Sequence, residues 1–323
     1  MSVLSKSYFH CEAAAFEHIE SVLLPHGPTC PHCGGTDRSK ALKGVRTKPS
    51  KKHPEGVERH GLKKCYDCRG QFTVRKGTIF EESHIPLHKW LQAIYLMTSS
   101  KKGISSHQMH RTLEITVKSA WFLTHRIREA MRSGDLSPMG GPGMVVEADE
   151  TYIGKREVRR ESDQRRGRPR KNKTSAADKN AVVSLVERGG RVRSFHVDHA
   201  TKASVSKIVW ENVNRESTFF TDESRLYNDV RPIIARSESV KHSAKEYVRG
   251  DVHTNTVEGY YSIFKRGMKG VYQHCKEKHL HRYLAEFDFR YNNRMARGVN
   301  DGERALNALQ GVVGKRLRYE GNC

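Results

Sequence analysis

The segment Met144-Val-Val-Glu-Ala-Asp149-Glu-Thr-Tyr-Ile153 has apolar and polar side chains that alternate from Val146 to Asp149. Alternation with a period of two is typical of a β-strand that buries one face. Asp149 falls near the C-terminal end of this strand, where a side chain can project from the edge of a sheet into a cleft. We therefore expect a strand here, with a carboxylate near its end.

Short apolar runs continue on the C-terminal side of this strand. They lie at 144–146, 181–186, 192–197 and 218–221, with a helical stretch at 201–214 and a longer one from Thr254 to about Arg294. Strands interrupted by helices indicate an α/β fold. We therefore predict a mixed sheet with flanking helices.

Two further carboxylates follow this pattern. The apolar run at 218–221 ends in Asp222, and Glu258 lies in a helix whose first turn holds Thr254 or Asn255 as its cap. Phosphodiester chemistry by two metal ions requires carboxylates that hold two hard cations about 4 Å apart. Two strand-end aspartates and one helical glutamate can supply such a site.

A lysine accompanies the third carboxylate. Lys265 lies seven residues, or about two helical turns, beyond Glu258, so both side chains can face one groove, with the lysine towards phosphate. A shift of either strand by one residue would turn other side chains into the cleft. The alternative carboxylates, which the sequence leaves open, are Glu147, Glu150, Glu223 and Asp198.

Four of the seven cysteines form two pairs with metal-ligand spacing. The pairs are Cys30-Pro-His-Cys33 and Cys65-Tyr-Asp-Cys68, and two thiolates on one such turn can bind the same tetrahedral zinc ion. The 31 residues between the pairs fit a zinc ribbon, whose two knuckles lie on separate hairpins joined by a loop of variable length. Four thiolates leave no place for water, so we predict a structural zinc ion. The alternative ligands are His32, His53 and His60.

Residues 87–131 have a helical pattern almost throughout and can hold three helices. Ser105 begins a capped helix, and the next helix starts near Thr116 or Val117. This pattern is typical of a helix-turn-helix motif, in which the second helix contacts bases in the major groove of DNA. The basic side chains of the second helix are Lys118, His125, Arg126 and Arg128, and they suit phosphates or bases. A plain helical hairpin with solvated basic faces is the alternative.

The charge balance indicates a polyanionic partner. The 323 residues include 58 Lys and Arg against 36 Asp and Glu, which gives a formal net charge of +22. So large an imbalance is self-repulsive unless a polyanion neutralises it, and nucleic acid is the expected partner. We expect no membrane partner, because no stretch approaches about eighteen consecutive apolar residues. Since the N-terminus has no signal-peptide pattern, we expect a cytoplasmic, nucleoid-associated protein.

Composition divides the chain into three parts. We expect an N-terminal helix and zinc ribbon at 1–80, a helical DNA-binding region at 81–136 and the α/β domain at 137–312. A basic insert at 155–179 carries eleven Lys and Arg against four acidic residues. Within it, Arg166 and Arg168 alternate with Gly and Pro, a pattern that fits narrow A·T-rich minor grooves. A basic loop without groove preference is the alternative.

These motifs resemble a known family, the ISXO2-like insertion-sequence transposases of bacteria and archaea, which have an N-terminal zinc ribbon and a DDE catalytic domain. The resemblance covers nearly the whole chain. The matching segments are CysProHisCys at 30–33, CysTyrAspCys at 65–68, PheThrValArgLysGlyThrIlePhe at 72–80, GluAlaAspGluThrTyrIleGly at 147–154, ThrAspGlu at 221–223, HisThrAsnThrValGluGlyTyrTyrSerIlePheLysArgGly at 253–267 and HisLeuHisArgTyrLeuAlaGluPheAspPheArgTyrAsn at 279–292.

The resemblance implies a ribonuclease H-like catalytic domain with an acidic triad on Asp149, Asp222 and Glu258 and an associated lysine on Lys265. Thirty-five residues separate Asp222 from Glu258, which is similar to the spacing often seen in DDE enzymes. Some relatives use asparagine in place of the third acid, so Asn255 is a rival for that role. The triad would hold two Mg²⁺ or Mn²⁺ ions. At least a homodimer on DNA is expected, because two ends must be brought together.

The predicted function is a DNA transposase that binds the terminal inverted repeats of its element, cleaves the ends with a metal-activated water and joins the 3′-hydroxyls to target DNA. One alternative is a DNA-binding regulator with a zinc ribbon, a helix-turn-helix and an inactive catalytic core. Another is a ribonuclease H-like nuclease without strand joining. Mg²⁺-dependent strand transfer of end-containing DNA discriminates between these functions.

Overall fold

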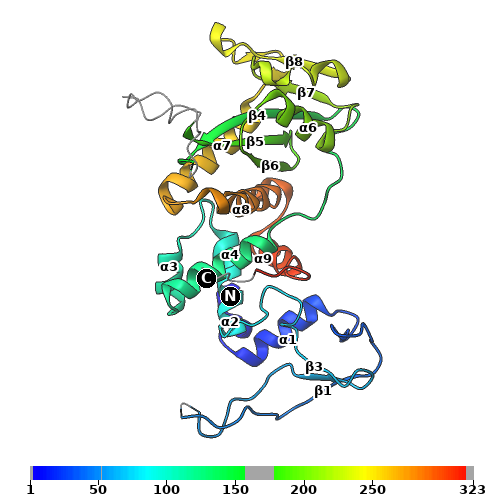
Figure 1. Ribbon diagram of the computed structural model, residues 1–323, viewed down its shortest axis with the longest axis vertical. Coiled ribbons are helices and arrows are strands. Elements are labelled where there is room, and N and C mark those ends of the chain that lie inside the picture. Colours follow the sequence, from blue (N-terminus) through cyan, green and yellow to red (C-terminus); the bar gives the residue numbers. More distant parts are fainter. Residues whose placement is uncertain (1–2, 52, 157–177, 318–323) are drawn as a thin grey trace, which may run out of the picture. The chain divides into compact units, whose positions relative to one another are not determined.

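The computed structural model describes residues 3–51, 53–156 and 178–317 (Figure 1). The chain folds as two compact units, and each is described by itself. Unit 1 comprises residues 1–132 and 300–323, and unit 2 comprises residues 133–299. Unit 1 is therefore discontinuous in sequence. The division made from the sequence differs here, because it assigned residues up to 312 to the α/β domain.

The N-terminal part of unit 1 contains a small antiparallel sheet. Its strands are β1 (Ser39–Ala41), β2 (Lys63–Cys65) and β3 (Gln71–Phe72), in the order β1-β2-β3. The buried cluster at this sheet consists of Cys30, Cys65 and Phe72. So small a core supplies little free energy of folding, and such modules usually depend on a metal ion or disulfides.

Helices form the rest of unit 1. The α-helices are α1 (Glu12–Leu23), α2 (Leu87–Ser99), α3 (Ser106–Leu113), α4 (Val117–Ala130) and α9 (Asp301–Gln310). The Ser105 hydroxyl accepts a hydrogen bond from the backbone N–H of Gln108, and the Thr116 hydroxyl accepts one from that of Ser119. These caps fix the starts of α3 and α4, at the residues that the sequence predicts.

The C-terminal helix α9 packs against α2 within unit 1. The buried guanidinium of Arg304 donates a hydrogen bond to the Thr98 carbonyl oxygen at 3.0 Å. Beyond the helix, Val313 forms a β-bridge with Thr78. These contacts explain why the residues from Asn300 onward belong to unit 1.

Unit 2 is built on a five-stranded mixed sheet (Figure 1). Its strands are β4 (Val145–Ile153), β5 (Asn180–Glu187), β6 (Val192–Val197), β7 (Thr218–Thr221) and β8 (Arg236–Ser239). They lie in the order β6-β5-β4-β7-β8. The pairs β4–β5 and β5–β6 are antiparallel, whereas β4–β7 and β7–β8 are parallel. The central strand β4 is the one that the sequence pattern predicts first.

Helices cover both faces of this sheet. On one face, α6 (Lys202–Asn212) packs with Val146 and Ala148 of β4. On the other, α7 (Asn255–Gly267) and α8 (Leu280–Asn292) pack with Ile153 of β4. Successive side chains of a strand point to opposite faces, so the odd-numbered residues of β4 lie on the face that α7 covers. This architecture confirms the predicted ribonuclease H-like mixed sheet with flanking helices.

Other elements of unit 2 differ from the sequence-based expectation. The helical stretch expected from Thr254 to about Arg294 is two helices, because a π-helical turn at Met268–Tyr272 and a 3₁₀ turn at Glu277–His279 separate α7 from α8. Strand β8 and the two-stranded pairing of β9 (Val248–Arg249) with β10 (Val252–His253) were not predicted. Strands of two to four residues are too short to show alternation.

Within the parts of the chain that the structure describes, no helix combines the length and the apolar character needed to cross a bilayer.

Candidate active site

Asp149 lies in the middle of the central strand β4 and not near its C-terminal end, as expected from the sequence, because the strand continues to Ile153. The backbone N–H of Glu150 donates a hydrogen bond to Asp149 Oδ1 at 2.8 Å. The hydroxyl of Tyr261, on α7, donates one to the backbone carbonyl oxygen of Asp149 at 2.6 Å. Helix α7 is therefore tied to the strand at the residue that carries the first predicted acid.

Asp222 follows directly after β7, the parallel neighbour of β4. The parallel pairing of β4 with β7 ends at Glu147 and Phe220, two residues before Asp149 and Asp222 along the two segments, and the charge of Asp222 acts on Asp149. The backbone N–H of Ser224 donates a hydrogen bond to Asp222 Oδ1 at 3.0 Å. This local bond is typical of a turn that starts at an aspartate, and it turns the chain away immediately after the acid.

Glu258 lies in the first turn of α7. The Thr254 hydroxyl donates a hydrogen bond to Glu258 Oε1 at 2.8 Å, and His242 Nε2 lies 3.7 Å from the same oxygen. The side chain of Glu258 is 46% exposed. The Glu258 carboxylate is thus held by Thr254, at the start of the helix, and remains accessible to solvent.

The electrostatics of Asp149 show that other acids act on it. Burial, together with the negative charges of Glu150, Asp222 and Glu258, raises the pKa of Asp149 to about 8. Acids from the end of β7 and from α7 therefore lie within electrostatic range of Asp149 on β4. Acids that share a site disfavour one another's ionised form, and a bound cation would remove that penalty.

The donor set fits a hard divalent cation, because carboxylate oxygens are the ligands that magnesium and manganese prefer. The three acids are less tightly grouped than the cysteines of unit 1. Over residues 3–51, 53–156 and 178–317, the four cysteines are the one set of metal-ligating side chains whose donor atoms all lie within 4.8 Å of one another. Asp149, Asp222 and Glu258 stay the predicted ligands of the divalent ions.

The predicted lysine lies on the same helix as Glu258. Lys265 Nζ is 5.8 Å from the centroid of the Tyr261 ring, whose hydroxyl binds the Asp149 carbonyl oxygen. Lys265 is therefore next to the side chain that ties α7 to β4. Asn255, the rival for the third acidic position, is the exposed first residue of α7, one turn before Glu258.

Three of the four alternative carboxylates differ in their surroundings. Glu150 lies within electrostatic range of Asp149 and Asp222. It accepts hydrogen bonds from the Tyr227 hydroxyl at 3.1 Å and the Ser224 hydroxyl at 3.4 Å, and burial, together with the charge of Asp222, raises its pKa. Asp198 is exposed just after the edge strand β6, and Glu223 is exposed beside Asp222. Glu150 follows Asp149 in sequence, but alternation along the strand turns it to the opposite face.

The fourth alternative, Glu147, is fully buried and caps helix α7. Its Oε2 accepts hydrogen bonds from the backbone N–H groups of Thr256 at 2.8 Å and Val257 at 3.0 Å. Its Oε1 accepts one from Arg188 Nε at 2.6 Å. These donors occupy both oxygens of Glu147. Sequence reasoning considered it only as a possible metal ligand and missed the capping role.

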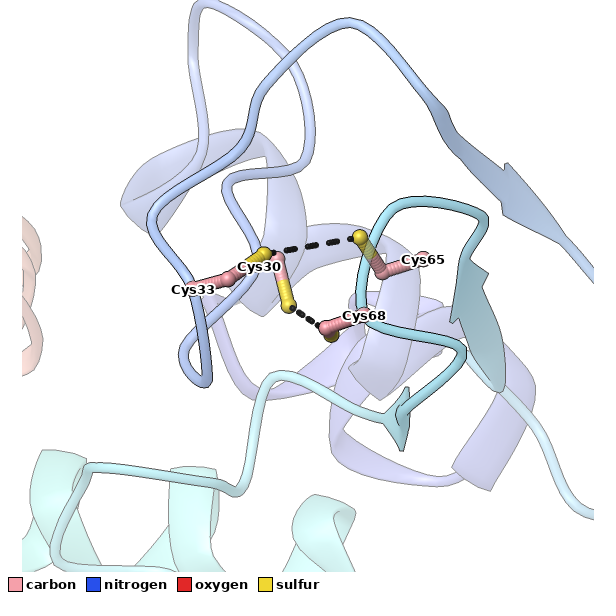
Figure 2. Close-up of side chains that lie close together, drawn as sticks. All are labelled: Cys30, Cys33, Cys65 and Cys68. Carbon is pink, nitrogen blue, oxygen red and sulfur yellow. Dashed lines mark hydrogen bonds between the residues drawn. The ribbon is translucent and has the colours of Figure 1, made fainter.

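The four cysteines of unit 1 converge (Figure 2). Cys30 Sγ lies 3.6 Å from Cys68 Sγ, and Cys33 Sγ lies 3.7 Å from Cys65 Sγ. Four zinc–sulfur bonds of about 2.3 Å in a tetrahedron place the sulfur atoms about 3.8 Å apart, whereas a disulfide requires about 2.05 Å. The geometry fits a zinc ion with four thiolate ligands and confirms the predicted zinc ribbon.

The backbone repeats around the two cysteine pairs. The N–H of Cys30 donates to the Gly35 carbonyl oxygen at 2.8 Å, and that of Cys65 donates to the Gly70 carbonyl oxygen at 2.9 Å. The residues directly after the pairs, Gly34 and Arg69, both have a positive φ, of 76° and 59°. The two pairs therefore form matching knuckles, each with a left-handed residue that reverses the chain.

The residues predicted to bind DNA from α4 divide into two groups. Lys118 is exposed in the first turn of α4. Arg126 and Arg128 are 4% and 1% exposed, and Arg126 Nη1 donates hydrogen bonds at 2.7 Å to the carbonyl oxygens of Ile79 and Glu81. Burial therefore argues against the expectation that these two arginines face DNA.

The remaining predicted DNA contacts, Arg166 and Arg168, lie outside the described residues.

A second basic segment, which sequence reasoning did not single out, joins α7 to α8. Its exposed basic side chains are Arg266, Lys269, Lys276, Lys278 and His281. Burial, together with the positive charges of Arg282 and Lys278, lowers the pKa of His279 to about 4. Arg282 Nη1 lies 2.9 Å from His279 Nδ1. The composition of residues 265–282 carries the signal, but a long helix with solvated charges has a similar composition.

Comparisons with known proteins relate the chain to a transposase family. Residues 140–292 match the family model described as the ISXO2-like transposase domain. A curated relative in Halobacterium salinarum, described as an uncharacterized protein in transposable element ISH50, is 30% identical over 234 residues, which are 70% of this chain and 76% of the relative. Among solved structures, a cryo-EM structure of the simian T-cell lymphotropic virus intasome in complex with PP2A regulatory subunit B56 gamma aligns with 13% identity and a TM-score of 0.28, over 56% of this chain and 67% of that chain. The chain belongs to the ISXO2-like family of insertion-sequence transposases.

Proposed function

We propose that this transposase binds the terminal inverted repeats of its element, cleaves DNA at the element ends and transfers the resulting 3′-hydroxyls into target DNA. One observation carries the proposal. Asp149 lies on β4, Asp222 follows β7 and Glu258 lies on α7, and burial, together with the charges of Glu150, Asp222 and Glu258, raises the pKa of Asp149. Several acids brought together in a strongly basic protein favour a metal-dependent reaction on a polyanion.

Each residue has a defined part in this mechanism. Asp149 and Asp222 present carboxylates from neighbouring parallel strands, and Glu258 presents the third from the start of α7. Bound magnesium or manganese would supply the Lewis acidity that activates the attacking oxygen and stabilises the leaving one. Lys265, two turns beyond Glu258, would contact a phosphate of the DNA strand.

Basic surfaces in each unit support DNA as the substrate. In unit 1, Lys118 is exposed in the first turn of α4, and the N-terminal residues of the second helix contact base edges in helix-turn-helix proteins. In unit 2, the cationic segment between α7 and α8 follows directly on the helix that carries Glu258. We propose that both surfaces bind DNA phosphates, which the net charge of +22 favours. Since two ends must be joined, we propose at least a dimer on DNA.

Strand transfer by purified protein tests this function. The substrate is a duplex that carries one element end, incubated with a supercoiled target and Mg²⁺ or Mn²⁺. We expect cleaved ends and joined product with the wild-type protein, and a loss of at least about 100-fold with Asp222→Asn, because that change removes a charged ligand. The matched control is Asp198→Asn, an exposed carboxylate just after β6 in the same sheet, which should retain full activity.

Each other outcome identifies a different function. Cleaved ends without joined product would identify a nuclease that lacks strand transfer. Specific binding of end DNA without cleavage would identify a DNA-binding regulator. Full activity of the Asp222→Asn protein would remove the catalytic assignment, and equal losses in both variants would show that the effect is not specific to the site.

A further inference from the structure

Glu147 and Asp149 are two residues apart on β4, so their side chains leave the strand on the same face. Asp149 belongs to the group of acids described above. Glu147 has no exposed surface, and its carboxylate lies at the N-terminal end of α7. A single strand thus presents one acid to the candidate metal site and a second acid to the helix that completes this site.

The contacts of Glu147 account for its buried charge. In addition to the two backbone N–H groups of α7 and Arg188, the Thr256 hydroxyl donates a hydrogen bond to Glu147 Oε1 at 2.8 Å. His253 Nδ1 lies 3.3 Å from the same oxygen. A buried carboxylate is costly unless such donors surround it. Its negative charge also complements the positive end of the α7 dipole.

Arg188 extends this contact to the chain that leads into α7. Its Nε donates to Glu147, while Nη1 donates to the Asp251 carbonyl oxygen at 2.8 Å and Nη2 to the His253 carbonyl oxygen at 3.0 Å. Arg188 directly follows β5, which pairs with β4. Strand, arginine and carboxylate therefore fix both the first turn of α7 and the residues before it.

We propose that Glu147 is a positioning residue, which anchors α7 so that the Glu258 carboxylate is held opposite Asp149. The inference rests on the proposed function and adds a residue to it. Glu258 directly follows Val257, whose N–H binds Glu147. A displacement of this first turn is therefore transmitted to Glu258 almost undiminished. Residues that orient metal ligands typically change metal affinity about 10–100-fold when they are replaced.

The Glu147→Gln variant tests the proposal in the zinc-loaded, full-length protein. It keeps the size of the side chain but removes the charge and replaces one acceptor with a donor. Calorimetry should show Mn²⁺ binding weakened by at least about tenfold. Hydrogen exchange without added Mn²⁺ should show faster exchange at Thr256 and Val257. In the cleavage reaction, the Mn²⁺ concentration for half-maximal rate should rise by a similar factor.

Glu187→Gln is the matched control. Glu187 is also a buried strand carboxylate, and it accepts a hydrogen bond from the Gly140 N–H at 2.7 Å and lies 3.5 Å from Arg191 Nε. The Glu187→Gln substitution should lower the thermal stability by weakening contacts similar to those of Glu147, but these contacts do not involve α7. If both variants lose similar thermal stability but only Glu147→Gln weakens Mn²⁺ binding, the weaker binding results from the loss of the positioning role of Glu147. Equal Mn²⁺ affinity in the two variants would overturn the proposal.

A milder variant covers the case in which Glu147→Gln does not fold. Thr256→Val removes one donor to Glu147 and leaves the carboxylate and both backbone bonds in place. It should weaken Mn²⁺ binding several-fold, and unchanged binding would count against the proposal. Calorimetry and hydrogen exchange remain informative if the wild-type protein does not cleave DNA, so failure of the proposed function and failure of the positioning role are distinguishable.

Discussion

Asp149 is the residue at which folding and the proposed chemistry oppose each other. Its carboxyl group is buried and lies near other negative charges, so the fold disfavours its ionised form. A metal ligand, however, must be ionised to bind. The free energy that a divalent ion gains at this site is therefore reduced by the cost of removing the proton from Asp149.

This conflict predicts that Asp149→Asn stabilises the protein in the absence of added divalent ions. Between the ordinary pKa of about 4 and the raised pKa of about 8, the folded protein holds a proton that the unfolded chain has lost. The stability of the wild-type protein therefore falls as the pH rises through this window. The variant has no carboxyl group at this position, so its stability shows no such fall. Each pKa unit corresponds to about 1.4 kcal/mol, so the effect is on the order of several kcal/mol.

Thermal melts at pH 5 and pH 8.5 measure this effect. The melting temperature of Asp149→Asn should exceed that of the wild type by more at pH 8.5 than at pH 5. The buffers must contain no chelator, because a chelator removes zinc as well. Asp198→Asn is the control and should show no such pH dependence. A difference between Asp149→Asn and wild type that is the same at both pH values would contradict the assigned pKa.

Among the elements, the zinc ribbon has only a small core of its own. Its buried cluster contains two cysteines and one phenylalanine, so we expect the metal to supply most of its stability, since zinc binding in such modules contributes about 10 kcal/mol or more. Cys65→Ser should make the amides of β2 and β3 exchange rapidly, while those of β5 in unit 2 keep their protection. Hydrogen exchange followed by mass spectrometry measures both segments in one experiment.

Cys11→Ser is the control for this prediction, because Cys11 is an exposed cysteine of the same unit. It should leave the exchange of β2 and β3 unchanged. Retained protection of β2 in the Cys65→Ser protein would show that the ribbon folds without its fourth thiolate ligand.

The elements also show how far the sequence alone could lead. Alternation identified β4, because apolar and polar side chains alternate from Val146 to Asp149, and CxxC spacing identified the zinc ligands, because one turn must present two thiolates. Neither signal distinguishes Glu147 from Asp149. Both acids lie on one face of β4, and only the position of α7, which is a property of the tertiary fold, makes one a cap and the other a candidate ligand.

Helix α4 shows a signal that the sequence did contain. Leu123, Ile127 and Ala130 lie on its buried face, and Arg126 is three residues after the first and four before the last. Side chains at these separations share a helix face, so the buried position of Arg126 followed from the apolar pattern. The charge of Arg126 led to the prediction that it binds DNA. An arginine can instead bury its long side chain and donate hydrogen bonds to carbonyl oxygens.

For the molecule as a whole, unit 1 is discontinuous in sequence, so we predict that its stability depends on the C-terminal helix α9. Leu309 of α9 is 2% exposed, whereas Leu306 on the same helix is 37% exposed. Leu309→Ala should lower the free energy of unfolding of unit 1 by about 2–5 kcal/mol, as is usual for a buried leucine. Leu306→Ala should change it by less than about 0.5 kcal/mol.

Denaturant unfolding, with hydrogen exchange at α2 and β5 to assign the loss to a unit, measures both variants. The exchange of α2 should rise in Leu309→Ala and that of β5 should not. Equal effects of the two substitutions would show that α9 does not stabilise unit 1.

The same discontinuity affects the order of events on the ribosome. Residues 133–299 are complete in the nascent chain before α9 is made, so the catalytic unit can fold during translation while α2 still lacks its partner helix. A message truncated after residue 299 would yield an N-terminal unit without the helix that covers α2. We therefore do not expect truncated forms of this transposase to accumulate as stable proteins. They would then not compete with the full-length protein for the DNA ends that it would bind.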